Sequence, residues 1–222
     1  MQLKISPSMM CADIGNLIPT LRTFEACKID YLHIDIMDGH FVPNFTLGTD
    51  YCKSIKKLTS IPLDIHLMIE KPEEKLGWFE FGENDIVSVH AESTAHLQKT
   101  LAEIRKRGAK AYVALNPATP LCVLEDILDD LDGVMIMAVN PGFAGQKMVP
   151  SAIDKIKHLR QYLDSRGYTN VEIEVDGNVS FENSVKMRNA GANILVAGTS
   201  SVFNSAFSLE EGIRKFRDGL AE

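Results

Sequence analysis

Short apolar runs alternate with amphipathic segments along the chain. Eight runs rich in Val, Ile and Leu are typical of β-strands, at residues 3–9, 31–38, 62–69, 85–90, 110–116, 133–140, 171–177 and 194–199. Apolar residues at helical spacing predict helices at residues 13–27, 95–107, 148–166, 180–189 and 208–220. Strands that alternate with helices indicate a parallel sheet, and eight such units with right-handed crossovers close into a barrel. We therefore expect a single (β/α)8 TIM barrel, an α/β fold, over residues 1–222.

Residues that start or stop helices support these boundaries. Asp13 is a typical N-cap residue for the first predicted helix, and Gly108 follows the second as a stop signal. Gly167 ends the third predicted helix in the same way. The last helix begins with Ser208 and carries Glu211 three residues later, which predicts a capping box.

The composition narrows the classes of protein that fit. The chain has 222 residues, 45% of them hydrophobic, enough for a substantial core. No apolar run approaches the roughly 18 residues that span a bilayer, and residues 1–5 are typical of a strand rather than a signal peptide. A net charge of −7 without a basic stripe argues against nucleic-acid binding. The four cysteines lack C-x-x-C spacing, so we expect reduced thiols in a cytoplasmic protein. From the charge and the short apolar runs we expect neither nucleic-acid nor membrane partners.

Polar side chains gather on one face of the second predicted strand. Successive strand residues point to opposite faces, so His33, Asp35 and Met37 share one face and Ile34 and Ile36 take the other. The third strand repeats this pattern with a histidine and a methionine, and the seventh carries an aspartate near its end. The residues expected to bind a metal at these strand ends are His33, Asp35, His66 and Asp176. Two nitrogens and two carboxylates suit one divalent ion, and Zn, Fe(II), Mn and Co all remain open.

The two aspartates predict proton-transfer chemistry. In an eight-stranded barrel the second and seventh strands lie nearly opposite, so Asp35 and Asp176 should face each other across the mouth, where the active sites of such barrels lie. Carboxylates on both sides of a substrate can remove a proton from one face of a carbon and deliver one to the other face. A divalent ion would polarise the neighbouring carbonyl and stabilise an enediolate oxygen. This arrangement favours an enzyme that inverts a carbon centre.

Glycine-rich segments predict an anion site and a closing loop. Gly177 and the segment GTSS at 198–201 follow the last two strands, where barrels commonly bind phosphate, and residues 201–203 could form the short extra helix of such a site. The segment NPGFAGQK at 140–147 lacks the spacing of a P-loop. Its two glycines around an aromatic residue favour a mobile loop that closes over a substrate.

Four segments of the chain resemble the ribulose-phosphate 3-epimerase family. They are HIDIMDGHFVPN at 33–44, LDIHLM at 63–68, NPGFAGQ at 140–146 and EVDG at 174–177, in the order that the family has them. The resemblance covers essentially the whole chain and implies a barrel of the ribulose-phosphate-binding type. It further implies a metal-dependent epimerase that inverts carbon 3 of a small phosphorylated ketose, D-ribulose 5-phosphate to D-xylulose 5-phosphate. Related barrels form dimers or hexamers, so we expect a homo-oligomer.

The resemblance also implies roles at the matching positions. His33, Asp35, His66 and Asp176 would hold the metal, and Asp35 and Asp176 would also act as the acid–base pair. The residues expected to contact the substrate and its phosphate are Ser8, His66, Gly142, Phe143, Ala144, Gly145, Gly177, Asn178, Gly198 and Thr199. The residues expected to line the face of the enediolate are Met37, Met68 and Met137.

Two departures from the family pattern leave the substrate open. Family members often carry glycine where Ala144 and Asn178 stand. The residues MC at 10–11, Ala144 and GTS at 198–200 also look like the allulose-6-phosphate branch of the family. Conversion of D-allulose 6-phosphate to D-fructose 6-phosphate is therefore the alternative to the pentulose reaction.

Two further classes of protein fit the sequence less well. A metal-independent lyase or decarboxylase on a related barrel needs a strand-borne lysine, as in Asp-x-Lys-x-x-Asp, and residues 33–38 contain none. A non-catalytic barrel that binds a phosphosugar leaves the histidines and aspartates at the strand ends without a purpose.

The remaining polar residues suggest structural roles. Asp38 is expected to cap a turn and Asp64 to lie lower in the barrel than the site. Residues 125–130 predict an acidic, solvated helix face. The histidines expected to be structural or exposed are His90, His96 and His158, whereas His40 could have a functional role.

Overall fold

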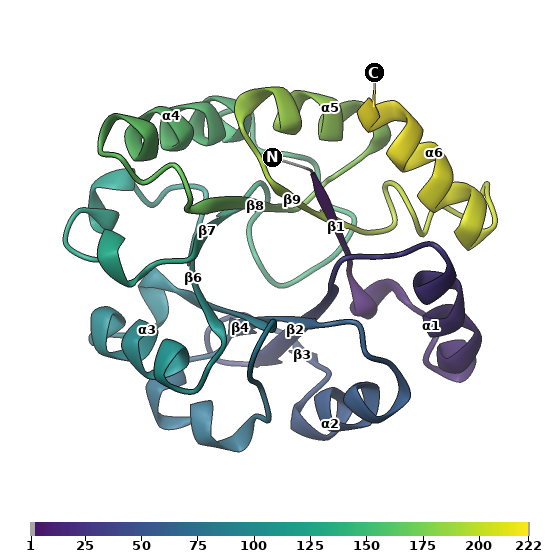
Figure 1. Ribbon diagram of the computed structural model, residues 1–222, viewed down its shortest axis with the longest axis horizontal. Helices are drawn as coiled ribbons and strands as arrows, with labels where there is room; N and C mark the ends of the chain where they lie inside the picture. Colours follow the sequence, from purple (N-terminus) through teal and green to yellow (C-terminus); the bar gives the residue numbers. More distant parts are fainter. Residues whose placement is uncertain (1–2, 222) are drawn as a thin grey trace.

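The predicted barrel is present in the computed structural model of the protein, which describes residues 3–221 (Figure 1). Met1 and Gln2, expected to lead into the first strand, lie outside this range. The ring consists of β1 (Lys4–Pro7), β2 (Leu32–Asp38), β4 (Leu63–Met68), β5 (Ile86–His90), β6 (Lys110–Leu115), β7 (Gly133–Met137), β8 (Glu172–Asp176) and β9 (Ile194–Ala197). Each prediction of a strand is confirmed, although most strands are shorter than expected.

The strands of the ring are parallel and follow the order β1-β9-β8-β7-β6-β5-β4-β2. The ring closes between β1 and β2, where Ser8 forms a parallel bridge with His33 and the Tyr31 amide donates a 3.4 Å hydrogen bond to the Ile5 carbonyl. A short strand that the sequence did not predict, β3 (Phe45–Thr46), pairs antiparallel with the end of β2.

Helices surround the ring (Figure 1). They are α1 (Leu17–Ala26), α2 (Thr49–Leu58), α3 (Leu97–Lys106), α4 (Ala152–Ser165), α5 (Phe181–Ala190) and α6 (Leu209–Ala221). The predicted capping box is confirmed, because Ser208 Oγ accepts a hydrogen bond from the Glu211 amide and Glu211 Oε2 accepts one from the Ser208 amide. No helix within residues 3–221 has the length and apolar character needed to cross a lipid bilayer.

Three predictions of helical segments were wrong or incomplete, and one helix was not predicted. Residues 14–16 form a 3₁₀ turn capped by Asp13 ahead of α1, so α1 begins later than predicted. Helix α2 was missed, although Tyr51, Cys52, Ile55 and Leu58 recur at helical spacing in the sequence. The acidic segment at 125–130 forms a turn followed by a short 3₁₀ helix (Leu128–Asp130) rather than an α-helix. Residues 201–203 form hydrogen-bonded turns in place of the short extra helix.

Inward-facing side chains fill the ring in layers, and the Val, Ile and Leu residues on its outer face pack against the helices. The layer near the amino-terminal ends of the strands consists of Tyr31, Ile86, Tyr112 and Ile194. A buried polar layer follows and consists of Ser6, His33, Asp64 and Glu174. The polar layer supports the carboxyl-terminal mouth, where the strand ends carry the site described below.

Substitution of Gly133 would test how tightly the layer near the amino-terminal ends of the strands is packed. A Cβ atom at this position would overlap the ring of Tyr112, whose hydroxyl donates a 2.9 Å hydrogen bond to Glu172. We expect Gly133→Ala to lower the free energy of unfolding by about 1–3 kcal/mol, as overpacking does in cores. The control is Gly77→Ala, because a Cβ there meets no atom within 4 Å. Urea titration checks the prediction, and equal stability of the two variants would contradict it.

Candidate active site

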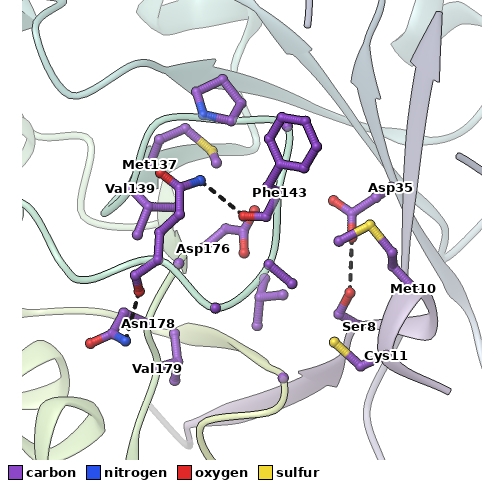
Figure 2. A pocket seen from close by; sticks show the side chains of 18 of the residues that line it. Ser8, Met10, Cys11, Asp35, Met137, Val139, Phe143, Asp176, Asn178 and Val179 are labelled. Carbon is purple, nitrogen blue, oxygen red and sulfur yellow. Dashed lines mark hydrogen bonds between the residues drawn. The ribbon is translucent and has the colours of Figure 1, made fainter. Parts of the chain in front are cut away.

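A pocket opens at the carboxyl ends of the strands (Figure 2). Its floor includes Asp35, Asp176 and the methionines Met37, Met68 and Met137. The predicted substrate contacts that line it are Ser8, Gly142, Phe143, Ala144, Gly145, Gly177, Asn178, Gly198 and Thr199. His33 and His66 lie beneath this lining and have no exposed surface. The structure thus brings the predicted site residues together at one mouth.

Four of these side chains form a compact cluster. His33 Nε2 lies 3.2 Å from Asp35 Oδ1 and 4.0 Å from Asp176 Oδ2. His66 Nδ1 lies 3.3 Å and 3.7 Å from the same two oxygens. One ligand atom from each residue lies within 4.8 Å of the other three. Asp35 and Asp176 therefore approach each other across the mouth, as the barrel geometry predicted.

The cluster fits a divalent metal ion. A tetrahedral ion with bonds of about 2.0–2.2 Å holds its ligand atoms about 3.3–3.6 Å apart, and four of the distances above, from 3.2 to 4.0 Å, bracket that range. Two imidazole nitrogens and two carboxylates also match the donor set of first-row divalent metals. This buried His/Asp cluster could hold a metal ion.

Hydrogen bonds below and beside the cluster orient two of its members. His33 Nδ1 lies 2.6 Å from Asp64, which also accepts a 2.8 Å hydrogen bond from Ser6. Asp64 therefore has the supporting position expected for it, since a carboxylate at the second nitrogen orients a metal-binding histidine. Ser8 donates a 2.9 Å hydrogen bond to Asp35 Oδ2 (Figure 2). Asp35 Oδ1 is left to face the two histidines.

The two carboxyl groups of the cluster differ in acidity. Burial raises the pKa of Asp35, but the charges and hydrogen bonds of His33 and His66 outweigh it and hold that pKa below its usual value. Burial and the nearby Asp35 charge raise the pKa of Asp176. Burial lowers the pKa of His33, yet Asp64 and Asp35 keep it well above the usual value. The cluster therefore holds protons that a divalent cation would displace.

One group near the cluster was not identified from the sequence. His90 was expected to be structural, and the structure places it, fully buried, with its Nε2 2.8 Å from His66 Nε2. Burial lowers the pKa of His90 to about 4. Burial opposes ionisation of Glu92, but hydrogen bonds from His90, Thr119 and the Asn116 amide lower its pKa to about 2. The signal in the sequence is that Ser88 and His90 share the inner face of a strand.

The other polar residues follow the expectations in part. Asp38 Oδ1 accepts hydrogen bonds from the amides of His40 and Phe41, so it caps the turn as predicted. The exposed histidines are His40, His96 and His158. The sequence did not assign a site role to several other residues of the pocket lining, which include Val139, Val179 and Val196.

Side-chain amides hold the predicted closing loop over the pocket. Gln146 Nε2 donates a hydrogen bond to the Phe143 carbonyl, and Asn178 donates one to the Gln146 carbonyl (Figure 2). Gln146 Nε2 also donates one to the Asn140 carbonyl. Asn44, in the turn after β2, donates a 2.8 Å hydrogen bond to the Gly142 carbonyl. The loop therefore contacts two other strand ends, and its mobility stays a prediction.

The fold and site define an α/β-barrel enzyme with a buried His/Asp metal-site candidate at its mouth. Residues 4–203 match the sequence profile described as the Ribulose-phosphate 3 epimerase family. The chain belongs to this family of isomerases.

Individual relatives agree with this assignment. The chain is 45% identical to Ribulose-phosphate 3-epimerase of Bacillus subtilis, over 89% of this chain and 91% of that protein. It is 46% identical to the chloroplastic Ribulose-5-phosphate-3-epimerase of Arabidopsis thaliana, over 90% of this chain and 72% of that one. Among solved structures, 3-hexulose-6-phosphate synthase from Salmonella typhimurium has a TM-score of 0.67 at 14% identity, covers 99% of each chain, and is similar in fold alone.

Proposed function

We propose that the protein interconverts D-ribulose 5-phosphate and D-xylulose 5-phosphate as a metal-dependent 3-epimerase. The observation that carries the proposal is the pair of carboxylates, Asp35 and Asp176, that meet within a four-residue His/Asp cluster at the floor of the pocket. The relatives with this activity in their names support a pentulose as the substrate. The proposal includes a cytoplasmic, homo-oligomeric enzyme, as expected from the sequence.

The two aspartates carry out the proton transfers. One removes the proton from carbon 3, and the other delivers a proton to the opposite face of the same carbon. Their positions at the ends of β2 and β8, on different sides of the pocket floor, support this division, because each carboxylate can then reach a different face of the carbon. A divalent ion held by His33, Asp35, His66 and Asp176 would supply positive charge that makes the proton on carbon 3 more acidic.

The methionines protect the reacting carbon. Met37, Met68 and Met137 line the pocket together with Asp35 and Asp176. Their thioethers are polarisable and have no acidic proton. The surface that these methionines contribute therefore supplies no proton to a carbanion-like centre in this pocket.

Backbone amides are proposed to bind the phosphate. The lining residues in the described chain include no lysine or arginine, so charge neutralisation by a side chain is unavailable in the pocket itself. Gly177 and Asn178 lie at its edge with φ angles of +109° and +50°, and Gly198 and Thr199 lie beside them. Successive amides in such turns form concave anion sites.

An isotope experiment tests the proposal. Protein loaded with Mn(II) is incubated with D-ribulose 5-phosphate in heavy water, and NMR follows the products. We expect D-xylulose 5-phosphate that carries deuterium at carbon 3, since the proton delivered comes from a group that exchanges with solvent. D-Allulose 6-phosphate is offered in parallel, and a higher kcat/KM for it would reassign the substrate to a hexulose. Turnover of the pentulose without deuterium at carbon 3 would contradict the two-aspartate mechanism.

A further inference from the structure

We propose that His90 and Glu92 form a hydrogen-bond relay that fixes which nitrogen of His66 faces the metal position. Both are positioning residues, because they act through His66 and lie outside the pocket lining. The inference deepens the proposed function and depends on its metal site. It assigns a purpose to a buried histidine that the proton transfers do not use.

The His66 ring is held between two different surroundings. Its Nδ1 faces Asp35 Oδ1 at 3.3 Å and Asp176 Oδ2 at 3.7 Å. Its Nε2 faces His90 Nε2 at 2.8 Å. Two ring nitrogens at this distance form a hydrogen bond when one carries a hydrogen and the other presents a lone pair. Both side chains have no exposed surface, so the direction of this one bond determines the tautomer of His66.

Glu92 sets the direction of the bond. Its Oε1 accepts hydrogen bonds from the Asn116 amide at 2.9 Å and from the Thr119 hydroxyl. Its Oε2 lies 3.3 Å from His90 Nδ1. An ionised carboxylate can only accept, so His90 donates through Nδ1–H and presents the lone pair of Nε2. His66 must then donate through Nε2–H, and its Nδ1 lone pair points at the two aspartates.

With this relay, each histidine of the cluster is oriented by a carboxylate, one directly and the other through a second imidazole ring. His33 is oriented directly, since its Nδ1 lies 2.6 Å from the Asp64 carboxylate. His66 reaches its carboxylate, Glu92, through the intervening ring of His90. The Phe41 ring packs against His90 with a centroid distance of 4.6 Å and helps to fix that ring. Carboxylates that orient metal-binding histidines raise metal affinity, and their removal typically costs about 10–100-fold.

Replacement of Glu92 by glutamine reverses the relay while keeping its shape. The Asn116 amide is a fixed donor, so the carbonyl oxygen of a glutamine side chain stays with it. The NH₂ group then faces His90 Nδ1 and donates, and His90 is forced to donate through Nε2–H to His66. His66 must carry its hydrogen on Nδ1, where it points at the metal position. A nitrogen that carries a hydrogen cannot bind a metal ion.

The test measures the affinity of the full-length protein for Co(II), by competition with a chelator and by the visible absorption of the bound ion. We expect Glu92→Gln to raise the dissociation constant about 10–100-fold. The matched control is Glu103→Gln on the exposed face of α3, which should leave it unchanged. Thermal unfolding of the metal-free proteins checks that the variants fold. Equal affinity in the wild type and Glu92→Gln would overturn the relay, and a wild type that binds no Co(II) would overturn the metal site as well.

A second variant separates the relay from packing. His90→Phe removes the ring nitrogens, so His66 is free to adopt the tautomer that binds the metal, and we expect a smaller loss of Co(II) affinity than in Glu92→Gln. The double variant should bind like His90→Phe alone, since Glu92 acts only through His90. ¹⁵N NMR of the Zn(II)-loaded wild type should show His66 with its hydrogen on Nε2 and His90 with its hydrogen on Nδ1. The opposite tautomers, or additive losses in the double variant, would overturn the proposal.

Discussion

Replacement of Asp176 by asparagine is expected to lower kcat for epimerisation at carbon 3 by about 10²- to 10⁴-fold, the typical contribution of a general acid or base. The amide has nearly the same shape but neither gains nor loses a proton near neutral pH. Asp35→Asn should have an effect of the same size, because each direction of the reaction needs both groups. Steady-state assays in both directions, with the metal content of each variant measured, check this prediction.

Two comparisons make this result interpretable. Asp154→Asn removes an exposed carboxylate in the first turn of α4 and should leave kcat unchanged. If Asp176→Asn lowers turnover at full metal occupancy, the loss lies in proton transfer rather than in metal binding. Near-normal turnover in either active-site variant would refute the mechanism with two aspartates, even if the protein binds a metal.

Gly177→Ala is expected to destabilise the fold strongly. The residue has a φ of +109°, and a Cβ atom would lie 2.6 Å from Val139 Cγ2 and 2.9 Å from the Val139 amide nitrogen. Backbone strain and overpacking each cost about 1–3 kcal/mol, and neither can relax easily against a neighbouring backbone. The displacement of the backbone at this position should also lower activity, because Asp176 and the amides proposed to bind the phosphate adjoin this residue.

Gly167→Ala is the matched control for this prediction. Gly167 has a φ of +85°, but a Cβ atom there meets nothing within 4 Å, so strain remains without the clash. It also lies outside the pocket lining, so its activity should be retained. Thermal unfolding gives the comparison, with about 2–4 °C expected per kcal/mol in a chain of this size. Similar melting temperatures for the two variants would show that the contact with Val139 relaxes.

The alternation of inward and outward side chains made the strands and the metal cluster predictable. His33 and Asp35 lie two residues apart on β2, and any parallel barrel brings that face to Asp176 at the end of β8. Strand ends were less predictable. The sequence extends the sixth strand to residue 140, whereas β7 ends at Met137, because the chain turns there to hydrogen-bond with the segment that leads into α4.

The parts of the site that the sequence did not reveal depend on distances between rings. His90 differs from His96 and His158 only by its position on an inner strand face, and the contact with His66 requires the registers of β4 and β5 and both ring orientations. Strand β3 was missed because it has two residues, neither of them buried, and so shows no alternation. Helix α2 carries Tyr51, Cys52, Ile55 and Leu58 at helical spacing, so this pattern was in the sequence and was overlooked.

The closure of the ring has a consequence for folding. The backbones of β1 and β2 are joined by the bridge between Ser8 and His33 and one long hydrogen bond, with the Ser8–Asp35 side-chain hydrogen bond beside them, whereas β1 pairs with β9 over four residues. The candidate metal ligands lie on both sides of the closure between β1 and β2. His33 and Asp35 are on β2, and Asp176 is on β8, which follows β1 and β9 around the ring. An ion in the cluster would link the strands on the two sides of this closure. At a concentration 100 times its dissociation constant, it would add about 2.7 kcal/mol to the stability of the fold. The availability of the ion would then set the stability of the barrel as well as its ability to react.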